Sequence, residues 1–161
     1  MTDSLLALDP GKVTGWSLWT LDDDFPMTRL EYGLAKGGID GFISFMELRL
    51  GIWRPDIIVC EHFDLDGRTR YPDLTPRDCE GALRAMVSAL GLEVVWQNTD
   101  MKALCRDQTL KDHGLWLTGS DPAIRHDDAR DVNDSQVHAL AYAKASGHEP
   151  TVALYWPEQP D

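Results

Sequence analysis

Residues 5–21, LLALDPGKVTGWSLWTL, decide the fold of this chain. The segment predicts a β-hairpin, because apolar runs over 5–9 and 14–21 flank a short stretch of structure-breaking residues. Pro10, Gly11 and Gly15 make a tight turn between the two strands possible. Asp9 ends the first strand, directly before the turn. An Asp before Pro is common in turns, so a purely structural role for Asp9 stays open at this point.

The following segments predict a mixed sheet covered by helices. Residues 27–37 alternate as a third strand, and 39–53 carry apolar residues at helical spacing. The apolar run over 56–61, DIIVCE, is typical of a strand buried on both faces. Since the connection to it runs through a helix, this strand should lie parallel to the first. Asp9 and Glu61 are therefore expected at the same edge of the sheet.

The second half of the chain continues with helices and strands. In chain order, the predicted elements are a helix over 76–90 capped by Thr75 and ended by Gly91, and a strand over 92–97. A short helix that contains Met101, Lys102 and Leu104, capped by Asn98 or Thr99, and a last helix over 132–146 follow. Residues 148–161 form a tail, in which 152–156 is predicted to add an edge strand. Because no segment has the composition of a linker, residues 1–161 are predicted to form one domain.

Composition limits the function classes. No apolar run approaches the roughly 20 residues that cross a membrane, and the N-terminus lacks a basic-then-apolar signal, so we expect a cytoplasmic protein. The three cysteines share no CxxC spacing, which predicts buried, reduced thiols. The formal charge of −12 is opposite in sign to what phosphate binding normally requires. The acidic turn at Asp22–Asp24 and the acidic tail account for part of it.

Four carboxylates are candidates for one metal site: Asp9, Glu61, Asp131 and Asp134. Carboxylate oxygens are the ligands that hard divalent cations prefer, and such sites carry out phosphoryl chemistry. An acid that closes an apolar strand, as Glu61 does, is costly unless it is paired or bound to metal. Asp131 and Asp134 are three residues apart on one helix face, although first-turn acids also stabilise a helix by themselves. Asp127 and Asp128 compete for the role of Asp131.

The order of elements and four motifs resemble the RuvC family of Holliday junction resolvases. The motifs are LALDPGKVTGW at 6–16, IIVCE at 57–61, WQNTDMKAL at 96–104 and DVNDSQVHALAYA at 131–143. The segment KDHGLW, 111–116, is similar to phage-type members of the family. The resemblance covers residues 4–146 and implies an α/β fold of the RNase H-like type, a mixed five-stranded sheet flanked by helices.

The resemblance also implies an activity. Family members are homodimers that cleave four-way DNA junctions with two Mg²⁺ or Mn²⁺ ions. For this chain, we expect the cytoplasm of a bacterium or of a phage-infected host cell. Asp9, Glu61, Asp131 and Asp134 match the four acidic sites, and the helix over 76–90 matches the dimerisation helix.

Basic residues and one histidine complete the matched site. Lys102 and Lys111 match cations near the scissile phosphate, although a lysine is more often a solvated surface residue. His138 stands where the bacterial pattern has its final Asp. It is expected to orient Asp134, to approach the metal, or simply to be a buried, hydrogen-bonded histidine.

The loop over 62–74 is the predicted DNA contact. It combines aromatic and basic side chains, Phe63, Arg68, Arg70 and Tyr71, which suit stacking on an unpaired base at a junction. An ordinary loop without this task remains possible. Two rival functions also stay open: a nuclease for flapped or branched replication intermediates, and a catalytically inactive nucleic-acid-binding module of the same fold.

Overall fold

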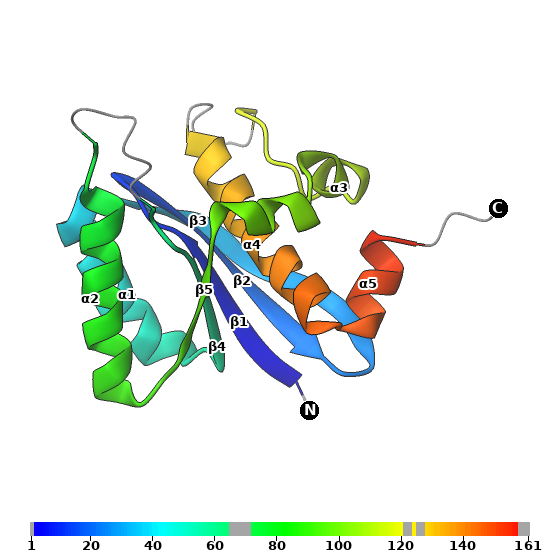
Figure 1. Ribbon diagram of the computed structural model, residues 1–161, viewed down its shortest axis with the longest axis horizontal. Helices are drawn as coiled ribbons and strands as arrows, with labels where there is room; N and C mark the ends of the chain where they lie inside the picture. Colours follow the sequence, from blue (N-terminus) through cyan, green and yellow to red (C-terminus); the bar gives the residue numbers. More distant parts are fainter. Residues whose placement is uncertain (1, 65–71, 121–123, 125–127, 158–161) are drawn as a thin grey trace.

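A five-stranded mixed sheet forms the centre of the molecule (Figure 1). The computed structural model describes residues 2–64, 72–120, 124 and 128–157. The strands lie in the order β3-β2-β1-β4-β5. Their bounds are β1 Thr2–Asp9, β2 Val13–Asp22, β3 Phe25–Lys36, β4 Ile57–Glu61 and β5 Val94–Gln97. β1, β2 and β3 form an antiparallel meander, whereas β4 lies parallel to β1 and β5 parallel to β4. The predicted hairpin and the parallel crossover are confirmed.

Helices cover both faces of this sheet. Helices α1 (Gly38–Trp53) and α2 (Thr75–Leu90) lie on one face, and α4 (Ala129–Ser146) lies on the other (Figure 1). The 3₁₀ helix η1 (Thr99–Leu104) and the short helix α3 (Asp107–Asp112) connect β5 to the α4 side. None of the helices in the described residues is long and apolar enough to cross a membrane. The three cysteines are buried free thiols, as expected.

Alternation along the strands divides the core into two clusters. On β1, Leu5 and Ala7 face α4, whereas Leu6 and Leu8 face α1 and α2. Because successive side chains of a strand point to opposite faces, Asp9 belongs to the α4 face.

Two helix starts differ slightly from the prediction. Thr75 is the first residue of α2 instead of its cap, and its amide donates to Asp73 Oδ1 at 3.1 Å. Helix α4 begins at Ala129, three residues before the predicted start, so Asp131 lies in its first turn and Asp134 in its second. Helix ends are the least certain part of any sequence-based assignment.

The predicted edge strand over 152–156 is wrong, because this segment belongs to helix α5 (Glu149–Tyr155). Its buried residues are Thr151 and Tyr155, four apart, which is helical spacing. The Thr151 hydroxyl accepts a hydrogen bond from the Met27 amide at 2.8 Å, so the helix docks through a side chain where a strand would have paired through its backbone.

Gly15 has another role than the predicted one. It lies within β2, paired with Asp9, and is not part of the turn. A Cβ atom built on Gly15 would overlap the backbone carbonyl of Asp131. The missing side chain therefore lets the first turn of α4 approach the sheet directly beside Asp9.

Candidate metal centre

Asp9 and Glu61 meet at the edge of the sheet, as the sequence predicts. Leu8 pairs with Cys60 in the parallel β1–β4 ladder. Asp9 and Glu61 directly follow this pair and end their strands, so they lie side by side. Val59 belongs to the core cluster on the α4 face of the sheet. Glu61 lies two residues further along β4, so its side chain points to the same face. Both carboxylates therefore point to the α4 face. Ligand atoms of Asp9, Glu61 and His138 all lie within 4.8 Å of one another.

The Asp9–Glu61 pair shares charge unequally. Burial, together with the adjoining Glu61 carboxylate, raises the pKa of Asp9 well above its usual range. Burial alone would also raise the pKa of Glu61, but the close contacts with His138 and Asp9 and the charge of Lys102 hold it below its usual range. Without metal, Glu61 is therefore ionised, and Asp9 is the residue that holds a proton most easily.

Helix α4 adds two further carboxylates. Asp134 Oδ2 lies 3.1 Å from Lys102 Nζ and 3.9 Å from Arg130 Nε. Burial raises the pKa of Asp131 to about 6, with contributions from Asp134 and Asp128. Asp134 is thus joined to the Asp9–Glu61 pair through the lysine, and its negative charge adds to the rise in the pKa of Asp9. Asp131 is linked to this group by the charge of Asp134, which contributes to the raised pKa of Asp131.

His138 supports Glu61, and not Asp134. Its side chain is fully buried, and its Nδ1 lies 2.7 Å from Gln97 Oε1. Its Nε2 lies 3.2 Å from Glu61 Oε2 but has no well-aligned hydrogen bond. If Nδ1 donates its proton to Gln97, the Nε2 lone pair faces a carboxylate oxygen. Protonation of the ring or a cation between the two atoms would satisfy that contact.

Lys102 lies at the centre of the acidic group. Its Nζ is 3.1 Å from Glu61 Oε2 and 3.1 Å from Asp134 Oδ2, and 27% of its side chain is exposed. Burial alone would lower the pKa of Lys102, but the charges of Asp9, Asp134 and Glu61 outweigh it and raise that pKa. Among the two lysines singled out by the sequence, Lys102 is therefore the one in contact with the acids.

Lys111 lies farther out, on a groove beside this group. Its Nζ stands over the Trp116 ring, 4.6 Å from the centroid. The groove has a volume of about 460 Å³, and its lining includes Lys102, Arg106, Lys111 and Asp134. Arg106 and Lys111 are exposed, so their charges are available to a ligand in this groove.

The predicted DNA loop is only partly described. Arg68, Arg70 and Tyr71 lie outside the described residues. Phe63 is half-buried and lines a small pocket with Glu61, Pro10 and Thr99. Its amide donates to Glu80, a buried carboxylate of α2 that also lies 3.0 Å from His62 Nδ1.

The sequence did not predict the roles of four neighbours of the site: Gly15, Glu80, Gln97 and Thr99. Thr99 Oγ1 donates to Glu61 Oε1 at 3.3 Å, and Gln97 supports His138. Glu80 alone left a signal, because it occupies the same apolar helix stripe as Leu83 and Val87, where a charge is out of place. Gln97 and Thr99 lie in the WQNTDMKAL motif, but nothing local predicts their contacts, because their partners are distant in sequence.

The donors present fit a divalent cation. They are mainly carboxylate oxygens, which suit Mg²⁺ and Mn²⁺ better than softer metals. A positive group, Lys102, already bridges two of them. The buried His138 Nε2, which has no aligned hydrogen bond and lies 3.2 Å from Glu61 Oε2, could add a nitrogen ligand to these oxygens.

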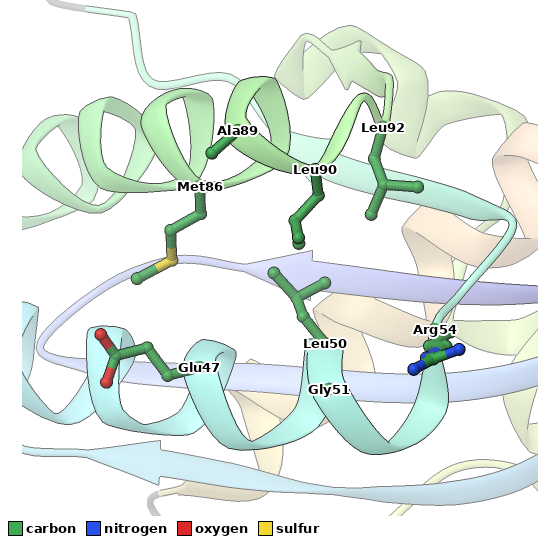
Figure 2. A pocket seen from close by; sticks show the side chains of 8 residues that line it. All are labelled: Glu47, Leu50, Gly51, Arg54, Met86, Ala89, Leu90 and Leu92. Carbon is green, nitrogen blue, oxygen red and sulfur yellow. The ribbon is translucent and has the colours of Figure 1, made fainter.

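A large apolar groove lies elsewhere, between α1 and α2 (Figure 2). Its volume is about 580 Å³, and its lining residues are Glu47, Leu50, Gly51, Arg54, Met86, Ala89, Leu90 and Leu92. It lies at the C-terminal end of α2, whereas α2 starts on the side where β4 ends at Glu61. This groove therefore does not belong to the acidic site.

The sheet order and its two helical layers define the RNase H-like fold, which confirms the predicted fold class. Solved structures of this fold include Thermus thermophilus RuvC in complex with a Holliday junction substrate, with a TM-score of 0.65 and 14% identity. That alignment covers 91% of this chain and 97% of the RuvC chain. No protein-family profile matches the chain, and no curated sequence matches it significantly.

Two eukaryotic and viral resolvases share the same architecture. The yeast mitochondrial Holliday junction resolvase Ydc2 aligns with a TM-score of 0.64 and 13% identity, over 89% of this chain and 79% of its own. The fowlpox virus Holliday junction resolvase aligns with a TM-score of 0.62 and 11% identity, over 88% of this chain and 99% of its own. The similarity extends over nearly the whole chain, and at these identities it establishes the fold.

Proposed function

We propose that this protein is a metal-dependent endonuclease that cleaves four-way DNA junctions. The observation that carries the proposal is the Asp9–Glu61 pair, joined by Lys102 to Asp134, at one edge of a fold that three Holliday junction resolvases share. Carboxylates from two strands and a helix converge there, which is what a phosphodiester hydrolase of the metal-dependent type requires.

Asp9, Glu61, Asp134 and Asp131 are the residues that would hold two Mg²⁺ or Mn²⁺ ions. When bound, such ions activate a water as nucleophile and stabilise the leaving 3′ oxygen. The chain's own groups prepare the site. Thr99 donates a hydrogen bond to one Glu61 oxygen, and His138 lies 3.2 Å from the other. Gly15 lets Asp131 approach β2.

Cations of the neighbouring groove would receive the DNA backbone. Lys102 and Lys111 are proposed to neutralise charge near the scissile phosphate, with Arg106 on the same groove. Phe63, whose backbone is held by Glu80, is proposed to stack on a base at the junction point, together with Arg68, Arg70 and Tyr71. These local cations offset, at the place of binding, the overall charge of −12.

A homodimer would present two such sites to opposite strands of a junction. We propose that α2 forms the interface, because Ala85, Ala89 and Leu90 are exposed on it, and Ala89 and Leu90 line the apolar groove of Figure 2. The proposed setting is the cytoplasm of a bacterium or of a phage-infected host cell. Sedimentation of the protein with Ala89→Arg, which places a charge on this surface, tests the interface: the variant should be monomeric where the wild type is dimeric.

Cleavage assays test the activity itself. Wild-type protein with Mn²⁺ should nick a synthetic four-way junction at symmetric positions, and Asp9→Asn should not. Flapped and linear duplex DNA of the same sequence serve as comparison substrates. Equal cleavage of flap and junction would favour a general branched-DNA nuclease, and binding without cleavage of any substrate would favour an inactive module.

A further inference from the structure

The Lys102 ammonium occupies a position that a metal ion would be expected to take. It lies 3.1 Å from an oxygen of Glu61 and 3.1 Å from an oxygen of Asp134, which come from β4 and α4. Asp9 acts on the same ammonium through its charge. A typical surface ion pair has one partner and full hydration. Lys102 instead has several carboxylates around it and is half-buried.

The oxygens that hold Lys102 are those of proposed metal ligands. Glu61 Oε2 faces both Lys102 Nζ at 3.1 Å and His138 Nε2 at 3.2 Å, so two nitrogen atoms already share this oxygen. An ammonium and a divalent cation on the same oxygen atoms would repel each other strongly in a partly buried site. Lys102 and a metal ion are therefore alternative occupants of the Glu61–Asp134 position.

We propose that Lys102 is an internal counter-ion that holds the Glu61–Asp134 position in the metal-free protein and leaves it when a divalent cation binds there. This proposal rests on the metal centre of the proposed function. In the metal-free protein Lys102 keeps mutually repelling carboxylates in place, and its departure is part of the cost of metal binding. Lys102 is thus a positioning residue that sets metal affinity.

The surroundings of Lys102 give the displaced side chain a place to go. It also lines the groove that carries Arg106 and Lys111, next to Asp134. A lysine has a flexible four-carbon stem, so its ammonium can move between neighbouring positions while the backbone of η1 stays fixed. In the metal-loaded protein the charge of Lys102 is therefore added to the other cations of this groove.

Calorimetric titration with Mn²⁺ tests the exchange directly. Wild-type protein stripped of metal is compared with Lys102→Met, Lys102→Arg and Lys111→Met. Lys102→Met should bind Mn²⁺ about tenfold or more tightly than wild type, because no ammonium has to leave. Lys102→Arg, which keeps the charge, should bind no more tightly than wild type. Lys111→Met removes the same charge from the groove without touching the acids, and should change affinity less than about twofold.

Thermal unfolding provides a second readout that does not depend on activity. Lys102→Met without metal should melt below wild type, since its carboxylates lose their counter-ion. Saturating Mn²⁺ should raise the melting temperature more in Lys102→Met than in wild type. A metal affinity of Lys102→Met equal to or weaker than that of wild type overturns the proposal, and so does equal tightening by Lys111→Met.

One further variant separates this proposal from the proposed function. Asp9→Asn should weaken Mn²⁺ binding, because Asp9 belongs to the metal centre. If Asp9→Asn leaves binding unchanged, the metal centre itself is wrong and both proposals fail. If Asp9→Asn weakens binding while Lys102→Met does not strengthen it, only the role of Lys102 fails.

Discussion

The two faces of the sheet are packed by different chemistry. Helix α4 contributes four of the buried polar side chains, Asn133, Ser135, Gln136 and His138, and they bond to the sheet, to the segment at Leu115–Leu117 or to one another. On the opposite face, α1 buries only Phe42, Met46 and Leu50, and the groove in Figure 2 extends this apolar layer to the surface.

This difference shows how the fold positions a charged site. Buried polar groups must keep their partners, so a helix that carries several of them has one allowed position on the sheet. Apolar contacts are non-directional and tolerate small shifts. The carboxylates of β1 and β4 therefore meet a helix whose position is fixed to within hydrogen-bonding distances.

The largest effect is expected from Asp9→Asn. Cleavage should fall by more than about 100-fold. Removing a residue that merely orients a metal ligand already costs up to about 100-fold, and Asp9 is proposed to be a ligand itself. The metal-free protein should nevertheless melt at a higher temperature, because Asn removes the conflict with Glu61 that raises the pKa of Asp9. The measurements are junction cleavage and thermal unfolding in chelator. Glu47→Gln, an exposed acid on the apolar groove, is the matched control and should change neither. A lower melting temperature for Asp9→Asn would count against a crowded acidic cluster.

Glycine substitutions on the two faces should have opposite signs. Gly15→Ala should reduce the free energy of unfolding by about 3 kcal/mol, because the new Cβ overlaps the Asp131 backbone and pushes α4 away from β2. Gly51→Ala, in α1 with no atom within 4 Å of the added carbon, should raise it by about 0.5–1 kcal/mol. Urea unfolding measures both. Equal effects of the two substitutions would show that α4 is no more tightly fitted than α1.

Substitutions of core side chains test the same difference between the two faces of the sheet. His138→Phe should cost about 2 kcal/mol, because Gln97 loses its partner in a buried position. It should also weaken Mn²⁺ binding by about 10-fold, since Glu61 loses one of the groups that orient it. Met46→Leu, a volume-conserving change on the apolar face, should cost less than about 1.5 kcal/mol. Denaturant unfolding and calorimetry distinguish them, and an unchanged metal affinity in His138→Phe would remove His138 from the site.

The smallest predicted effect is a pH dependence of the metal-free protein. Asp9 and Asp131 have a raised pKa in the folded state, that of Asp131 about 6, so the folded state binds more protons and loses stability as the pH rises through this range. Glu61 has a lowered pKa, so its contribution is lost as the pH falls below its ordinary value near 4.5. Stability in chelator should be greatest near pH 4.5, fall as the pH rises through about 6, and be lower at pH 8 by on the order of 1 kcal/mol.

Thermal unfolding across this range checks the prediction, and Asp9→Asn combined with Asp131→Asn should flatten the alkaline side of the curve. A wild-type curve that rises steadily from pH 5 to pH 8 would contradict the raised pKa of both acids. Saturating Mn²⁺ should flatten the same side of the curve, because bound metal stabilises the ionised carboxylates.

Strand and helix positions were largely predictable because they depend on local pattern. Alternation in Leu5–Asp9, the apolar run before Glu61 and helical spacing in α1 and α4 each lie within one segment. The predictions failed where the structure of a segment depends on contacts with residues distant in sequence. Thr151 and Tyr155 form a helix because they dock on β3 and its neighbours, and Gly15 is required by the backbone of Asp131.

The sequence by itself determined that Asp9 and Glu61 end neighbouring parallel strands, since residue order and the crossover rule fix that arrangement. Only the tertiary structure decided which groups complete the site. Lys102 lies between Glu61 and Asp134, and His138, held by Gln97, lies against Glu61, although each of these partners is more than 30 residues away in sequence. Such contacts depend on how α4 and η1 pack against the sheet, and packing between distant segments leaves no periodic signal in the chain.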